Sequence, residues 1–162
     1  MKRLLCLFLL ACLLMSGCSL SSFDSANAVS FYYVRNEYRQ DMTTLIKPER
    51  RNAAGHENDL SYLLALYLIG PSNNDLVSPL PSDTELLSVL QEDSTIAIQL
   101  SDTEKTMTDS HFALSCACLS MTCLDLTDAE SITITSGTRT ITMTRSNLSL
   151  TDNTNTATEE IQ

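Results

Sequence analysis

The stretch that decides the fold is "YLLALYLIGPSNNDLVSPLPSDTELLSV", which runs from Tyr62 to Val89. Apolar residues around its start lie on one face of a helix, and these are Leu60, Leu63, Leu64, Tyr67 and Leu68. We expect Asn58 to cap this helix and Gly70-Pro71 to end it. A proline-rich loop follows, and residues 84–91 ("TELLSVLQ") are then predicted to form a strand.

Strands are predicted on both sides of this stretch. Residues 29–35 ("VSFYYVR") are rich in β-branched and aromatic side chains, which favours a strand. Residues 43–51 predict a shorter strand, and Pro48 limits it to a sheet edge or a strand end. Residues 94–101 follow a turn at Glu92-Asp93, and their apolar side chains alternate with polar or small ones, so one face is buried.

The remaining part of the chain predicts a second helix and a hairpin. Residues 109–126 are expected to be helical, with Asp109 as the N-cap. Residues 131–135 ("SITIT") and 140–144 ("TITMT") flank Ser136-Gly137-Thr138-Arg139, which indicates a β-hairpin. Because two helices are interleaved with these strands, the predicted fold class is α+β, a two-layer sandwich of a mixed β-sheet with two helices.

The order of these signals resembles the GerMN domain of GerM-type sporulation and spore-germination lipoproteins. The resemblance lies in the helix with its leucine pair, then "GP", a polar loop, "SPLP" and a strand that begins "TELLSV". A hairpin, a helix and a second short hairpin follow in the same order, so the resemblance covers about Val29 to Thr144. It implies a compact α+β domain similar to the ring-building folds of secretion and sporulation channels, and it implies no reaction.

The N-terminus is predicted to be an export and lipidation signal. Two basic residues precede an apolar run from Leu4 to Met15, which as a helix would span about 18 Å of a ~30 Å membrane core. Such a short run favours a cleaved signal peptide over a transmembrane anchor. The small residues before Cys18 resemble a bacterial lipobox, which implies cleavage before Cys18 and lipid attachment to it. A plain signal peptide that happens to contain Cys18 is the alternative.

Four segments follow from these signals. They are a signal peptide at 1–17, a lipidated cysteine and spacer at 18–28, a GerMN-like domain at 29–148 and a disordered tail at 149–162. The tail has few apolar residues to bury, which is typical of disorder.

Acidic residues dominate the exported part of the chain. Removal of residues 1–17 takes away Lys2 and Arg3, and the formal net charge goes from −10 to −12. Nucleic acid and anionic lipid headgroups repel such a domain, so we expect no nucleic-acid partner and assign membrane attachment to the lipid on Cys18. The candidate protein partners are envelope or sporulation-channel proteins and a second copy of the chain.

Three cysteines, Cys116, Cys118 and Cys123, resemble a metal or disulfide set. On one helix, however, Cys116 and Cys123 lie about 10.5 Å apart along the axis, and a disulfide needs Cα atoms within ~7 Å. Cys118 points away from both, so no two of the three can bridge within the helix and no common metal is within reach. We therefore interpret them as small buried apolar residues, and we expect no metal site and no cofactor.

The sequence contains no recognisable catalytic motif. His56 and His111 have no partner at metal-ligand spacing, and "HEND" at 56–59 is interpreted as a solvated loop with a helix cap. Asp109, Ser110 and His111 carry the residue types of a hydrolytic triad, but neighbouring residues on a helix point in different directions. We therefore expect no enzyme and no catalytic residues.

Two surfaces are candidates for binding. The loop with Asn73, Asn74 and Asp75 is stiffened by prolines, and it is either an interface or a plain helix-to-strand connector. Threonines on the last two strands face outward, and Thr142 and Thr144 are chosen as edge-pairing positions. The alternative for these threonines is a solvated sheet face.

These observations lead to three function hypotheses. The first is a membrane-anchored, non-catalytic interaction or assembly module on the extracytoplasmic face of the cell membrane, in sporulation or spore germination. The second is an envelope domain that binds a small molecule or a cell-wall glycan, which requires a concave pocket with convergent polar groups. The third is an envelope hydrolase.

Overall fold

The computed structural model describes residues 27–37, 44–53 and 55–148. The predicted signal peptide, Cys18 and the predicted tail at 149–162 lie outside these residues. The elements in chain order are β1 (Ala28–Arg35), β2 (Ile46–Asn52), α2 (Leu60–Leu68), β3 (Leu76–Val77), β4 (Leu86–Glu92), β5 (Thr95–Leu100), α3 (Asp109–Leu126), β6 (Ser131–Ser136), β7 (Arg139–Thr144) and α4 (Arg145–Leu148). The predicted α+β class is confirmed.

The strands form two sheets. One has the order β2-β1-β3 and is antiparallel, and the other has the order β4-β5-β6-β7. In the second sheet β5 and β6 are parallel while the outer pairs are antiparallel, so this sheet is mixed. The sequence predicted a single mixed sheet, because strand patterns report which face of a strand is buried and not which strands pair.

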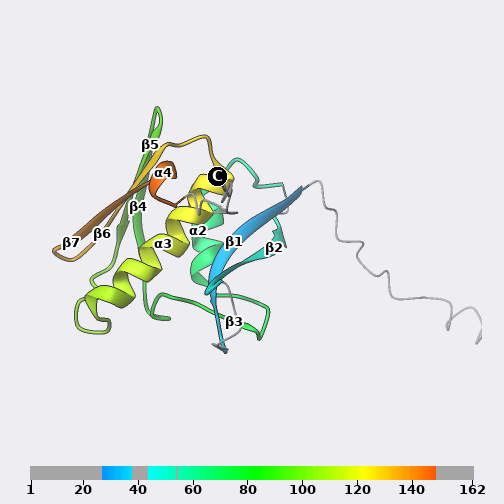
Figure 1. The fold of residues 1–162 in the computed structure, drawn as a ribbon. Helices are drawn as coiled ribbons and strands as arrows, with labels where there is room; N and C mark the ends of the chain where they lie inside the picture. The colour runs from blue at the N-terminus through cyan, green and yellow to red at the C-terminus, as the bar shows by residue number, and fades with distance from the viewer. Residues whose placement is uncertain (1–26, 38–43, 54, 149–162) are drawn as a thin grey trace, which may run out of the picture.

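Helix α3 joins the two sheets. It connects the parallel strands β5 and β6, packs on β6 and β7, and also packs along β1 (Figure 1). At β1 the Thr122 hydroxyl accepts a hydrogen bond from the Tyr32 backbone N–H (3.0 Å) and donates one to the Cys118 carbonyl (3.0 Å). A side chain of α3 therefore satisfies a donor of β1 that no strand of the described residues reaches.

Helix α2 is anchored by aromatic side chains. The rings of Tyr33 and Tyr67 stack with centroids 4.8 Å apart, and Phe31 meets Tyr67 edge-on at 6.0 Å. The Tyr33 hydroxyl donates to the Tyr67 carbonyl (2.9 Å), and the Tyr67 hydroxyl donates to the Tyr32 carbonyl (3.1 Å). The predicted apolar face of this helix is confirmed, since Leu63, Leu64 and Tyr67 are buried.

Both predicted helix caps are displaced by one residue. Asp59, not Asn58, caps α2 and accepts from the Tyr62 N–H (3.0 Å). Thr108, not Asp109, caps α3 and accepts from the His111 N–H (3.3 Å). Neighbouring residues with similar cap propensity cannot be ranked by composition, because the backbone conformation at the helix entry decides between them.

Smaller differences concern turns and short elements. The turn between β4 and β5 is Asp93-Ser94 rather than Glu92-Asp93, and Asp93 has a φ of 48°. The predicted loop after Gly70 contains β3, which pairs with the end of β1, and α4 follows β7 directly. Among the described residues, no helix has both the length and the apolar character needed to cross a membrane.

Candidate interaction surface

Strand β7 forms one edge of the mixed sheet, and Thr142 and Thr144 lie on it. Gly137 (φ 60°) and Thr138 make a two-residue turn, so Ser136 and Arg139 form the hydrogen-bonded pair that closes the hairpin. Hydrogen-bonded and non-bonded pairs then alternate along the hairpin. The alternation predicts that Glu130 and Arg145 form a hydrogen-bonded pair, and the Arg145 N–H does donate to the Glu130 carbonyl (2.9 Å).

This alternation decides which backbone groups of β7 are available. Ile141 and Met143 direct their N–H and C=O groups to β6, whereas Thr140, Thr142 and Thr144 direct theirs away from the sheet. Within the described part of the chain, no hydrogen bond reaches the backbone of Thr140 or Thr142 from that side. The edge that the sequence selected therefore presents unpaired donors and acceptors at Thr140 and Thr142.

The outer face of this sheet has little charge. Its side chains form cross-strand rows, in which the Thr133 and Thr142 hydroxyls lie 2.9 Å apart and those of Thr135 and Thr140 lie 3.2 Å apart. Three rows cross the four strands from β4 to β7, and they are Leu90–Ala97–Thr133–Thr142, Ser88–Gln99–Thr135–Thr140 and Glu92–Thr95–Ser131–Thr144. Glu92 is the one charged residue of these rows. Leu87 and Leu90 of β4 are more than half exposed.

The other described sheet edges have features that discourage strand addition. Strand β2 carries Pro48 and basic residues, β3 has only two residues, and β4 has an irregular register at Leu86 and Ser88 and packs against α2. Strand β7 has no proline and no break in register, and residues 140–144 are uncharged. It is the least protected edge of the described part of the chain.

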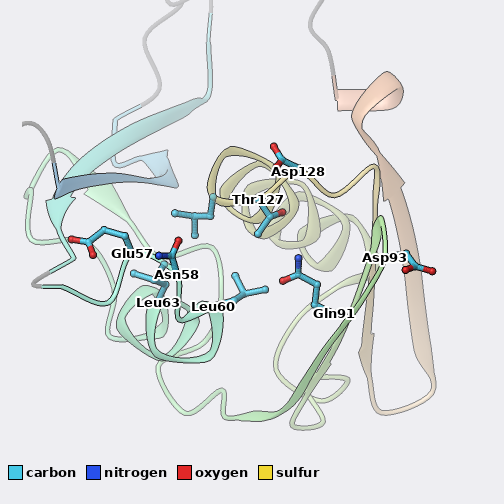
Figure 2. Close-up of a pocket in the computed structure, with 9 residues that line it drawn as sticks. Glu57, Asn58, Leu60, Leu63, Gln91, Asp93, Thr127 and Asp128 are labelled. Atoms are coloured by element: carbon cyan, nitrogen blue, oxygen red, sulfur yellow. The ribbon is translucent and has the colours of Figure 1, made fainter.

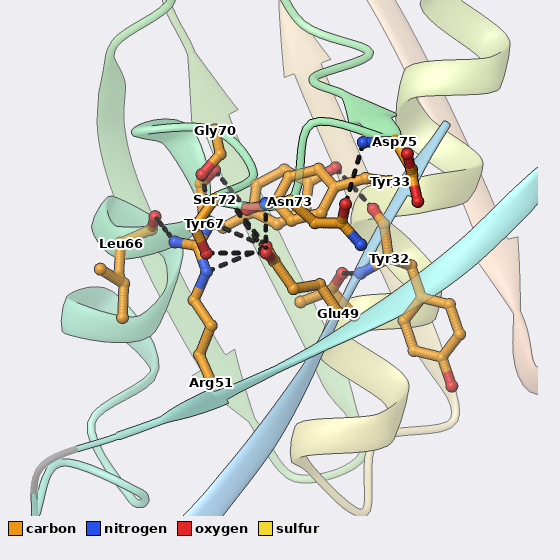
Figure 3. Close-up of polar contacts among 11 residues, drawn as sticks. Tyr32, Tyr33, Glu49, Arg51, Leu66, Tyr67, Gly70, Ser72, Asn73 and Asp75 are labelled. Carbon is orange, nitrogen blue, oxygen red and sulfur yellow. Dashed lines mark hydrogen bonds and ion pairs between the residues drawn. The ribbon is translucent and has the colours of Figure 1, made fainter. Parts of the chain in front are cut away.

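The loop with Asn73, Asn74 and Asp75, the second predicted binding surface, is held in place by hydrogen bonds to β2 (Figure 3). The Glu49 carboxylate accepts hydrogen bonds from the Ser72 hydroxyl (2.7 Å), the Ser72 N–H (3.0 Å) and the Asn73 N–H (2.8 Å). On the other side, Asn36 donates to the carbonyls of Asn74 (3.2 Å) and Asp75 (2.8 Å). Asn73, Asn74 and Asp75 are exposed but held in one shape, which fits both the connector and the interface interpretations.

Arg51 completes this network. Its guanidinium pairs with the Glu49 carboxylate (2.9 Å) and donates to the carbonyls of Gly70 and Leu66, which lie at the end of α2. Burial alone would raise the pKa of Glu49, but the hydrogen bonds from Ser72 and Arg51 and the charge of Arg51 outweigh it, and the pKa is lowered. Glu49 is therefore held as a carboxylate beneath the loop.

A cleft lies where the start of α2, the β4–β5 turn and the end of α3 meet (Figure 2). It encloses about 370 Å³ and is lined by Glu57, Asn58, Leu60, Leu63, Gln91, Asp93, Leu126, Thr127 and Asp128. Three leucines form its apolar part, and three carboxylates from separate segments lie around it. The lining contains no aromatic and no basic residue. Sequence patterns predict none of these residues as ligands, because they come from three distant segments.

The three cysteines of α3 are free and buried, which confirms their interpretation as small core residues. Burial raises the pKa of each thiol to about 12. No group of three or more His, Cys, Asp or Glu side chains within the described residues could hold a metal ion.

The two histidines lie in different parts of the fold. His56 is exposed before α2, where its ring stacks on Tyr62 at 4.1 Å, and His111 is exposed in the first turn of α3. The nearby Asp109 carboxylate lies 3.6 Å from the Arg139 guanidinium. The structure thus gives Asp109 a basic partner on β7.

One protein-family model matches most of the chain. The model of the Germane family, described as sporulation and spore germination, matches residues 30–143. The chain belongs to this family, so the family predicted from the sequence is confirmed.

The chain is similar to the crystal structure of a protein described as a lipoprotein from Clostridium perfringens, with 23% identity over 69% of this chain and 75% of the other and a TM-score of 0.44. Similarity at this level adds nothing to the assignment of fold or function. Comparison with curated proteins gave no match.

Proposed function

We propose that this protein is a lipid-anchored, non-catalytic interaction module on the extracytoplasmic face of the cell membrane, acting in sporulation or spore germination. The observation that carries the proposal is the β7 edge, whose outward backbone groups at Thr140 and Thr142 are unpaired within the described residues. Strand addition at such an edge gives affinity through the main chain, while neighbouring side chains give specificity. Membership of the Germane family supports the biological setting.

The membrane anchor is supported by the N-terminal sequence. The lipobox-like residues before Cys18 supply the acceptor for a diacylglyceryl group, and two acyl chains anchor a protein stably where one does not. Attachment at Cys18 leaves a short spacer before β1 begins at Ala28. The folded domain would therefore act close to the membrane surface, among other envelope proteins.

The non-catalytic role is supported by the positions of the polar groups. At the start of α3 the exposed Asp109 carboxylate lies 3.6 Å from the Arg139 guanidinium, and the Thr108 hydroxyl accepts a hydrogen bond from the His111 backbone N–H. The buried thiols of α3 have raised pKa values and so are poor nucleophiles.

A pair of variants at one position tests the use of the β7 edge. Thr142→Pro removes an outward N–H without removing a bond to β6, whereas Thr142→Ala keeps the N–H and removes only the hydroxyl. After cross-linking in the native envelope, the lipidated Ala variant should capture the partners of the wild type and the Pro variant should lose them. Circular dichroism and thermal unfolding check that both variants are folded.

Equal capture by folded Pro and Ala variants would contradict edge pairing. It would move the interface to the loop around Asn73, Asn74 and Asp75, which is exposed and held rigidly by Glu49.

A second candidate function is binding of a small molecule or cell-wall glycan, and the cleft between α2 and α3 favours it. Carboxylates and amides can bind sugar hydroxyls, but the lining lacks the aromatic rings on which sugars commonly stack. Titration of the folded protein with peptidoglycan fragments, followed by NMR, tests this candidate. Shifts confined to Asn58, Gln91 and Asp128, and lost in Asp128→Asn, would support it.

A further inference from the structure

Strand β7 has a sequence that is nearly the same in both directions. Residues 140–144 are "TITMT", with Thr142 at the centre, threonines at both ends and Ile141 and Met143 between them. We propose that the β7 edge pairs with β7 of a second copy of this chain, antiparallel, about a two-fold axis at Thr142. This inference rests on the proposed function, because it names the partner of the same edge.

The backbone phase of the hairpin permits this pairing. In an antiparallel pair centred on Thr142, this residue faces Thr142 of the second copy, and Thr140 faces Thr144 of the second copy. All of these residues direct their N–H and C=O groups away from β6. The two facing Thr142 residues can therefore exchange two N–H···O bonds without breaking any bond within the sheet. In each Thr140–Thr144 pair the Thr144 N–H can donate to the Thr140 carbonyl, while the Thr144 carbonyl caps α4.

The side chains also match in this register. On the outer face threonine faces threonine, which extends the rows already present as Thr133–Thr142 and Thr135–Thr140. On the inner face Ile141 of each copy faces Met143 of the other, and the unbranched Met side chain adapts to an irregular neighbour. A shift by one residue would place threonines against the inner face, so the pattern selects this register.

Electrostatics favours this edge as the meeting point of two acidic chains. After removal of residues 1–17 each copy carries a formal net charge of −12, yet residues 139–145 include no Asp or Glu. The arginines at the two ends of this segment are turned toward α3. The Arg139 guanidinium lies 4.3 Å from the Phe112 ring centroid, and Arg145 donates to the Leu124 carbonyl (2.9 Å). Two copies can therefore approach along β7 without bringing carboxylates of this segment together.

The expected contact is small. A single strand pair buries well under the ~800 Å² per partner of a standard interface, so we expect it to form where copies are concentrated rather than in dilute solution. Attachment of both copies to one membrane would supply that concentration. A two-fold axis along the membrane normal would leave both anchors on the same side.

A cysteine cross-link in the full-length protein in its host envelope tests the register. In Thr142→Cys the two introduced residues would face each other with Cα atoms about 5.5 Å apart, within disulfide range. In Thr140→Cys they would lie four residues out of register, about 13 Å apart, and could not bridge. The wild type controls for the native thiols, since Cys116, Cys118 and Cys123 are buried.

We expect mild oxidation to convert most Thr142→Cys protein to a reducible dimer, with at least tenfold less dimer for Thr140→Cys and none for the wild type. Equal dimer yields from both cysteine variants would overturn the register, because they would reflect random collision. Absence of dimer from Thr142→Cys, when maleimide still labels its thiol, would overturn self-pairing. The proposed function would stand in that case if Thr142→Pro still lost its partners, since the edge would then serve a different protein.

Discussion

Arg51 and Glu49 lie two residues apart on β2 and form an ion pair, with Arg51 Nη2 2.9 Å from Glu49 Oε2. Both side chains are largely buried, with 14% and 9% of their surface exposed. Across the β1–β2 pair, Glu49 lies opposite Phe31. The Arg51 guanidinium is on the same face of β2, 5.5 Å from the Phe31 ring centroid. The ion pair connects the edge of one sheet to the end of α2 and to the loop that follows.

The first prediction is that Glu49→Gln makes the protein less stable at neutral pH by about 1–3 kcal/mol, because the buried guanidinium loses its charged acceptor. The folded-state pKa of Glu49 is below the ordinary value of 4.5, so its contribution is complete above pH ~4.5. It is lost as the pH falls through the lower folded value. Urea unfolding between pH 7 and pH 3 should show the two stability curves converging toward acid.

Asp83→Asn is the control for this experiment, because Asp83 is exposed and makes no hydrogen bond within the described residues. It should change stability by less than about 0.5 kcal/mol at pH 7. A constant gap between wild type and Glu49→Gln down to pH 3 would show that the charge of Glu49 contributes nothing.

The second prediction concerns the turn before β7. Gly137 has a φ of 60°, and a Cβ added there would lie 2.6 Å from Asp102 Oδ1. Gly55 also has a positive φ, of 87°, but a Cβ there would meet nothing within 4 Å. Gly137→Ala should therefore cost about 1 kcal/mol more than Gly55→Ala, which carries the backbone strain alone. Thermal unfolding of the two variants measures the difference, and equal losses would mean that Asp102 moves aside freely.

Much of the fold follows from local sequence patterns. The bounds of α3 were predicted as residues 109–126, and the alternation of Ile96, Ile98 and Leu100 identified the buried face of β5. The strand limited by Pro48 is an edge strand, as predicted. These features depend on periodicity and on the chemistry of single residues, which a sequence displays directly.

Other features depend on contacts between distant residues. The division into two sheets, the two-residue strand β3 and the short helix α4 have no periodic signal long enough to detect. The hairpin of β6 and β7 was predicted because its turn signal is local, and β7, which carries Thr142 and Thr144, is an edge strand. The use of these two residues in binding stays a prediction. Local sequence patterns gave no sign that Glu49 binds the loop at Asn73, since 24 residues separate them.

The third prediction is that Cys116, Cys118 and Cys123 do not react with iodoacetamide in the native protein at pH 8. Burial raises the pKa of each thiol to about 12, so little thiolate is present and the sulfur is covered. Peptide mapping by mass spectrometry should find residues 109–126 alkylated only after denaturation.

The triple alanine variant of these cysteines should stay folded, with a loss of ~1 kcal/mol per site in the free energy of unfolding. Fast native labelling, or unfolding of the wild type by a mild reductant or a chelator, would contradict the assignment.

The last prediction tests the anchor, which lies outside the described residues. Cys18→Ala should release the protein from the membrane or leave it uncleaved, because the acceptor of the lipid and the residue after the cut are both lost. Cys12→Ala makes the same substitution inside the apolar run, keeps Cys18, and should be processed like the wild type. Membrane fractionation and metabolic labelling with a palmitate analogue compare the three proteins. Retention and labelling of the Cys18→Ala protein at wild-type levels would leave the plain signal peptide as the correct interpretation.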